Sequence, residues 1–183
     1  MRPWGAVVSA LLVATAAYGD VDVKAALPVL LKVLTYDVNF DARGAGTFVV
    51  LVVSESGQLT ARAGLVANMK DAGLTEVKKR PLKYVPVEYR DDAQLQGEID
   101  KHKASALLVV PGASKGTVKS LWELAQDNQL YALALEAETV ETHFPVGVSM
   151  SGDKPQIIIN EKSSKAVGAR FETVVLRMAK VIQ

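Results

Sequence analysis

Cysteine is absent from the 183 residues of the chain. This absence excludes a disulfide scaffold, a thiolate zinc site, an iron–sulfur cluster and a cysteine nucleophile. Histidine is scarce, because only His102 and His143 occur, and neither lies in a cluster with Asp or Glu at ligand-like spacing. We therefore expect no metal site and no cofactor.

An excess of charge of either sign is also missing. The chain has 21 Lys and Arg against 20 Asp and Glu, which gives a formal net charge of +1. Proteins that bind nucleic acid or anionic membranes usually carry a strong basic excess, so we expect neither partner. The basic run Lys78, Lys79, Arg80 and Lys83 is interpreted as a solvated face. A hydrophobic content of 49% excludes a disordered chain, and the length is that of one globular domain.

The common catalytic patterns are missing as well. Residues 111–117 read PGASKGT, but a phosphate-binding loop needs its Lys directly after the second Gly, whereas Lys115 precedes Gly116. We interpret Ser114 as a helix cap instead. No Ser lies in a Gly-x-Ser-x-Gly turn, and no dinucleotide-binding glycine pattern follows a strand-like run. We expect the protein not to be an enzyme.

The N-terminus has the pattern of a secretory signal peptide. Arg2 precedes an apolar stretch from Gly5 to about Ala17, which ends in small residues. A membrane anchor is the alternative, but the stretch is shorter than the roughly 20 residues that cross a bilayer. We predict a signal peptide over residues 1–19, with Ala14 and Ala16 offering an earlier cut as an alternative, and a mature domain over residues 20–183.

The mature chain alternates between helical and strand-like patterns. Helices are predicted for residues 22–36, 59–73, 91–103 and 114–129, and strands for residues 48–53, 82–89, 106–110 and 130–136. Pro86 places the strand of residues 82–89 at a sheet edge. A hairpin follows over residues 146–151 and 156–160, and then a helix over residues 164–182. Its predicted apolar stripe consists of Val167, Phe171, Val174, Val175, Met178 and Ile182. This order predicts a single three-layer α/β domain with a mostly parallel sheet, an antiparallel C-terminal hairpin and a closing helix.

Candidate binding residues follow from this topology. In an open α/β sheet, ligands bind outside the carboxyl ends of the strands. The residues at these ends are Ser54, Glu55, Ser56, Ser114, Lys115, Glu136 and Glu138. Their short polar side chains suit a small polar ligand or a loop of a partner. For the acidic group Glu136, Glu138 and Glu141, a solvated loop is favoured over acid–base chemistry.

The C-terminal half has a pattern formed by the hairpin strands at residues 146–151 and 158–160, by Lys165, Ala166 and Gly168, and by the closing Leu176, Met178 and Ala179. In this pattern it resembles the YfiR-type periplasmic regulators of bacteria. The segment ALLVVPGAS and the opening DVKAALPVLLKVL are similar to further parts of that family's pattern. The chain departs from it at residues 36–40 and 144–145, and without cysteine it cannot use the disulfides of some members.

This resemblance implies a non-enzymatic periplasmic regulator. It would bind and repress the sensory domain of an inner-membrane signalling protein, a diguanylate cyclase or a sensor kinase, and so control cyclic di-GMP or kinase output. A periplasmic small-molecule-binding protein is the alternative, with its ligand at the carboxyl edge of the sheet. The sequence leaves a homodimer open.

Overall fold

The computed structural model describes residues 22–152 and 154–183. The predicted signal peptide and its cleavage point lie outside the described residues. Within the described part, no helix combines the length and the apolar character that crossing a membrane requires.

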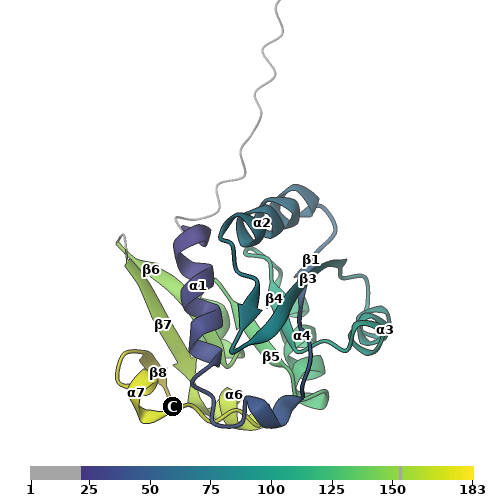
Figure 1. The fold of residues 1–183 in the computed structure, drawn as a ribbon. Coiled ribbons are helices and arrows are strands. Elements are labelled where there is room, and N and C mark those ends of the chain that lie inside the picture. The colour runs from purple at the N-terminus through teal and green to yellow at the C-terminus, as the bar shows by residue number, and fades with distance from the viewer. Residues whose placement is uncertain (1–21, 153) are drawn as a thin grey trace, which may run out of the picture.

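One eight-stranded sheet forms the centre of the domain (Figure 1). Its strands are β1 (Phe48–Ser54), β2 (Glu76–Val77), β3 (Arg80–Glu88), β4 (Ala106–Val109), β5 (Tyr131–Ala134), β6 (Val146–Ser151), β7 (Lys154–Asn160) and β8 (Lys180–Ile182). Their order in the sheet is β2-β3-β1-β4-β5-β6-β7-β8. The neighbours from β3 to β6 are parallel, and β6 and β7 form the antiparallel hairpin. The predicted α/β class and mostly parallel sheet are confirmed.

Helices cover both faces of the sheet and complete the three layers. Helices α1 (Val23–Leu34) and α2 (Leu59–Asp71) pack on one face. Helices α3 (Asp92–His102), α4 (Lys115–Asp127) and α5 (Ala137–Thr142) pack on the other. Successive residues of β1 alternate between the two apolar cores, so Val50 contacts the first and Leu51 the second. All seven residues of β1 are buried, as its unbroken apolar run predicts.

Strand β3 lies at the edge over most of its length. The short β2 pairs only with Arg80 and Pro81 at its start. The rest of β3, including Pro86, pairs with β1 on one side. Because proline cannot donate a backbone hydrogen bond, it is tolerated at such an edge, and the predicted placement is confirmed.

The single closing helix predicted for residues 164–182 is wrong. The chain instead forms α6 (Glu161–Ala166), α7 (Thr173–Leu176) and the strand β8, which pairs with β7 in parallel. Gly168 has a φ of +71°, a left-handed conformation that terminates helices. The backbone after it pairs with the segment that follows α1, since Glu172 N–H donates to the carbonyl of Tyr36 at 2.9 Å.

Breaking this helix also changes which of its residues are buried. Phe171 and Val175 belong to the core, as expected. Val174 and Met178, which the helical stripe placed inside, are 50% and 58% exposed.

Candidate functional site

The carboxyl edge of the parallel strands gathers the predicted site residues. Ser54 is the last residue of β1, Ser114 is the N-cap of α4 after β4, and Glu136 is the N-cap of α5 after β5. The loops that carry them meet because the strands run parallel. The structure therefore places these residues at one edge, while their role in binding stays a prediction.

Glu55 ties the loop after β1 to the start of α4. Its Oε1 accepts hydrogen bonds from the backbone N–H of Ser114 at 3.1 Å and from the hydroxyls of Ser114 and Thr117, each at 2.5 Å. Burial alone would raise the pKa of Glu55, but these hydrogen bonds outweigh it and lower the pKa below its ordinary value. Ser114 Oγ in turn accepts from Thr117 N–H at 3.3 Å, which confirms the predicted helix cap.

Glu136 lies deeper, and its Oε1 accepts a hydrogen bond from Gly112 N–H at 3.1 Å. Burial raises the pKa of Glu136, and although the bond from Gly112 opposes this shift, the nearby charge of Glu138 adds to it. Lys115 Nζ pairs with Glu138 Oε1 at 3.1 Å, but both side chains are well exposed. Such a surface pair stabilises little, so both groups remain available to a ligand.

The other predicted residues after β1 have different surroundings. Ser54 is buried, and its Oγ accepts a hydrogen bond from Arg62 Nη1 at 3.1 Å. Ser56 is exposed in the turn that follows. Gln58, which the sequence analysis did not select, accepts from Glu55 N–H and donates to the carbonyl of Pro111, at 3.0 and 3.2 Å. These contacts indicate a structural role for Gln58 between two loops.

A cleft of about 560 Å³ opens at this edge between the start of α4, α5 and β6. Of the predicted residues, Lys115, Glu136 and Glu138 line it, whereas Ser54, Glu55, Ser56 and Ser114 do not. The remaining lining residues are Gly112, Ala113, Val118, Leu135, Ala137, Thr139, Thr142, His143, Ser149 and Met150. The cleft thus combines carboxylates, hydroxyls, an imidazole and an ammonium group with an apolar wall.

Sequence reasoning missed the part of the cleft that α5 and β6 contribute. Residues 137–142 form a short helix where the sequence indicated a loop, and β6 pairs with β5 in parallel. Gly147 allows the close approach, because a Cβ there would lie 2.7 Å from the carbonyl oxygen of Ala134 and would also collide with Val140. A glycine inside an apolar strand was the available signal.

The arrangement suits binding of a small molecule. Among the described residues, no group of three or more His, Asp or Glu side chains is placed to hold a metal ion. His143 has a buried Nδ1 with no hydrogen-bond partner in that part of the chain, and it lines the cleft. A ligand here would meet the partly buried carboxylate of Glu136 inside and the exposed charges of Lys115 and Glu138 at the rim.

Comparison with known proteins identifies a fold but no family. No family model matches the sequence, and neither does any curated protein. A substrate-binding protein with adhesive properties from Clostridium difficile, in its ligand-free open form, superposes with a TM-score of 0.57 at 14% identity. That match covers 74% of this chain and 54% of the other.

Two further solved structures superpose over 88% of this chain. One is the ABC domain in complex with L-Trp from Streptococcus pneumonia, with a TM-score of 0.60, 10% identity and 62% of that chain covered. The other is a conserved domain protein from Vibrio cholerae, with a TM-score of 0.61, 13% identity and 60% of that chain covered. The chain spans less than two thirds of the length of each of the three. The chain therefore shares its fold with part of each of these three structures.

Proposed function

We propose that this is an exported, extracytoplasmic protein that binds a small molecule in the cleft at the carboxyl edge of its sheet. The observation that carries the proposal is the cleft itself, which joins polar groups from three segments to an apolar wall. Ligand sites in open α/β sheets lie at this edge, and they typically combine an apolar lining with a few polar groups. Support also comes from the shared fold, since one similar structure is a substrate-binding protein and another holds L-Trp.

The charges of the cleft favour a ligand with a cationic group and an apolar body. Glu136 is partly buried and close to a second carboxylate, so a bound cation would favour its ionised form. Val118, Leu135 and Met150 supply the apolar surface. At the rim, Lys115 can exchange its exposed partner Glu138 for an anionic group of the ligand.

Calorimetric titration of the exported protein with amino acids and small amines tests this function. A charge-assisted hydrogen bond contributes about 1.5 to 3 kcal/mol, so Glu136→Gln should weaken binding by about tenfold or more. Glu123→Gln is the matched control, because Glu123 is an exposed glutamate of α4 that does not line the cleft. Binding that Glu136→Gln leaves unchanged would contradict a site in this cleft.

A second candidate function is the regulator that the YfiR-type resemblance implies. Val174 and Met178 favour it, because the broken C-terminal helix leaves these large apolar side chains exposed at positions four residues apart. Exposed apolar surface commonly marks a contact with another protein. A regulator acts by binding one state of its receptor more tightly than the other. The receptor would be the periplasmic domain of a membrane diguanylate cyclase or sensor kinase.

Binding to such a domain, encoded beside this gene, tests the second candidate. Met178→Glu should weaken the complex, and deletion of the gene should raise cyclic di-GMP or kinase output. If the same surface instead forms a homodimer, sedimentation of the isolated protein will show a dimer in the absence of the receptor domain. Unchanged signalling in the deletion strain would contradict the regulator.

A further inference from the structure

A second cavity, of about 540 Å³, lies at the opposite edge of the sheet, where β1, β3 and β5 begin. Its lining includes Arg43, Arg80 and Ser105, together with the aromatic rings of Phe48 and Tyr131. None of the described residues that line it is an Asp or Glu, whereas Glu136 and Glu138 line the cleft at the carboxyl edge. The two cavities therefore differ in the sign of their charge.

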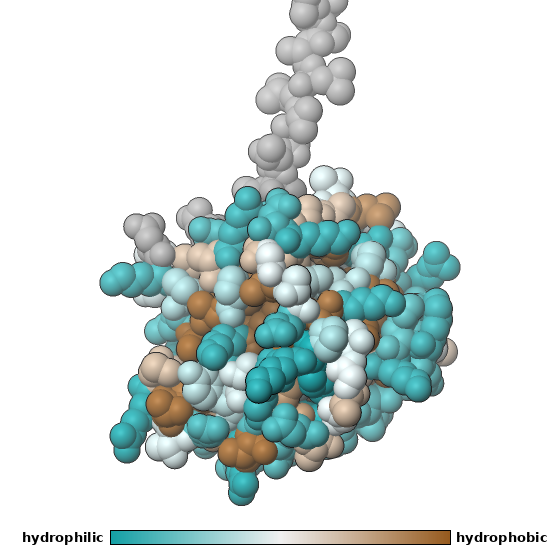
Figure 2. All heavy atoms as spheres, viewed as in Figure 1, coloured by the Kyte–Doolittle hydropathy of each residue, from teal (hydrophilic) through white to brown (hydrophobic). Residues whose placement is uncertain are grey.

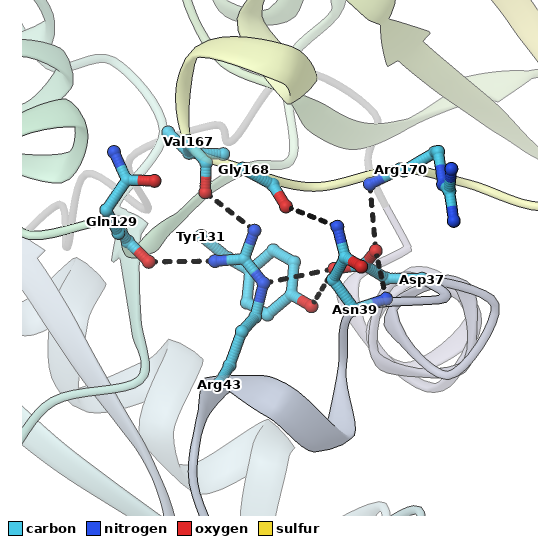
Figure 3. Close-up of polar contacts among 8 residues, drawn as sticks. All are labelled: Asp37, Asn39, Arg43, Gln129, Tyr131, Val167, Gly168 and Arg170. Atoms are coloured by element: carbon cyan, nitrogen blue, oxygen red, sulfur yellow. Dashed lines mark hydrogen bonds and ion pairs between the residues drawn. The ribbon is translucent and has the colours of Figure 1, made fainter.

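Arg43 forms a wall of this cavity, and each of its three guanidinium nitrogens has a partner (Figure 3). Its Nε lies 3.0 Å from Asp37 Oδ2, Nη1 donates to the carbonyl of Gln129 at 2.8 Å, and Nη2 donates to the carbonyl of Val167 at 2.6 Å. Asp37 neutralises its charge. Arg43 therefore stabilises the wall of the cavity, and its neutralised charge contributes little to binding an anion.

Arg80 is bound differently, because within the described residues its guanidinium has no carboxylate partner. Its Nε donates to the carbonyl of Gly46 at 3.0 Å, and Nη2 makes two contacts of 3.5 Å, to the carbonyl of Thr47 and to Ser105 Oγ. Nη1 is buried and has no hydrogen-bond partner there.

The surroundings of Arg80 are aromatic. Its guanidinium carbon lies 5.2 Å from the centre of the Phe48 ring and 5.5 Å from that of Phe40. Aromatic faces attract a cation but accept no conventional hydrogen bond. A partly buried charge without a counter-ion is costly, and proteins normally pair such a group.

Ser105 adds a second donor beside Arg80. Its Oγ accepts long hydrogen bonds from Val49 N–H at 3.4 Å and from Arg80 Nη2 at 3.5 Å. The hydroxyl proton has no acceptor within the described part of the chain. A guanidinium and a hydroxyl thus converge on one cavity. Within the described residues Arg80 Nη1 and the hydroxyl proton of Ser105 have no acceptor, and Arg80 Nη2 has only two long contacts, so an oxygen atom of a ligand could supply what is missing.

We propose that this second cavity binds a small oxyanion, a carboxylate or a phosphate, through Arg80 and Ser105. The anion accepts hydrogen bonds from the edge of the guanidinium, which exchanges its two weak 3.5 Å contacts for charge-assisted ones. The site is separate from the carboxyl-edge cleft and does not depend on the function proposed for that cleft.

Titration of the exported protein with sodium phosphate and, separately, sodium malonate tests the proposal, with sodium chloride at equal ionic strength as the reference. NMR of the Arg80 Nε–Hε group should show a saturable shift with at least one of the two oxyanions and none with chloride. The tighter anion identifies the source as phosphate or carboxylate.

Three variants locate the site. Loss of the charge-assisted bonds in Arg80→Gln should weaken anion binding by about tenfold or more. Arg80→Lys keeps the charge but loses the planar fork, so binding should be intermediate. Lys83→Gln removes an exposed charge from the same strand outside the cavity, and it should change the affinity less than about twofold.

Two results would overturn the proposal: no shift of Arg80 with either oxyanion, or unchanged binding by Arg80→Gln. If circular dichroism shows that Arg80→Gln does not fold, anion binding by Ser105→Ala provides the test instead. Weaker anion binding by Ser105→Ala supports the site, and binding equal to that of the wild type overturns it.

Discussion

Arg43 Nε lies 3.0 Å from Oδ2 of Asp37, and the side chain of this aspartate is completely buried. The same carboxylate accepts hydrogen bonds from the hydroxyl of Tyr131 at 2.6 Å and from the backbone N–H of Arg170 at 2.8 Å (Figure 3). Arg43 belongs to the short 3₁₀ helix η1 (Asp41–Arg43). One carboxylate therefore connects the segment after α1, η1, the start of β5 and the segment after α6.

Replacing Arg43 should destabilise the domain strongly. Arg43→Met leaves Asp37 as a buried charge without its cation, and such a change costs about 3 to 5 kcal/mol. Lys78→Met is the control, because the pair of Lys78 with Asp41 is exposed and contributes roughly 0 to 1 kcal/mol. Urea unfolding measures both. If both variants lowered the free energy of unfolding by the same amount, the neutral hydrogen-bond donors would be sufficient to stabilise the buried carboxylate of Asp37.

Replacing each of two glycines with alanine should change the stability of the domain in opposite directions. Gly147→Ala forces a Cβ against Val140 and the carbonyl oxygen of Ala134, so α5 must shift and the domain loses stability. Gly64 lies inside α2 with open space around it, and Gly64→Ala should stabilise by about 0.5 to 1 kcal/mol. Thermal melts of the two variants test this, and a neutral Gly147→Ala would contradict the close packing.

Two apolar residues near the C-terminus should differ sharply in their contribution to stability. Phe171 is 7% exposed and belongs to the core, so Phe171→Ala should cost about 3 to 5 kcal/mol. Met178 is 58% exposed, and Met178→Ala should change the free energy of unfolding by no more than about 0.5 kcal/mol. Both are measured by chemical denaturation. A large loss from Met178→Ala would instead indicate one continuous, packed C-terminal helix.

The stability of the domain should depend on pH through Glu55. Its pKa is lower in the folded state than in the unfolded state, so its ionised form stabilises the fold. This contribution is fully present above the ordinary pKa of a glutamate and is lost as the pH falls through the lowered value. Glu55→Gln should therefore be less sensitive to acid in that range.

Unfolding at a series of acidic pH values measures this difference. Glu136 provides an internal contrast, because its pKa is raised and the sign of its contribution is reversed. NMR titration should find Glu55 ionising at a lower pH than Glu136. The opposite order would show that the hydrogen bonds from Ser114 and Thr117 do not persist in solution.

The positions of apolar side chains on the surface do not follow from the amino-acid composition. Figure 2 shows hydrophilic side chains over most of the visible face, with separate apolar patches among them. The sequence predicts that Val174 and Met178 belong to the core, whereas the structure exposes them. The spacing of apolar residues predicts which side chains would share one face of a helix. It does not show whether the chain forms a continuous helix there.

The sequence by itself determined the central architecture. The apolar run of β1 predicts a strand covered on both faces, because such a run would be unstable at any solvated surface. Strands that alternate with helices run parallel in the sheet. The carboxyl ends of parallel strands lie at one edge of the sheet. The positions of Glu55, Ser114 and Glu136 at that edge therefore followed from chain order alone.

The tertiary structure decided the C-terminal segment and the contents of both cavities. Gly168 ends α6, and the backbone beyond it finds partners at Tyr36 and in β7, which local spacing does not encode. The bond between Asp37 and Tyr131 joins residues 94 positions apart, and a pairing over such a distance leaves no local pattern. Arg80 differs from its neighbouring lysines for the same reason, since its burial against Phe40 and Phe48 exists only once those distant segments have packed together.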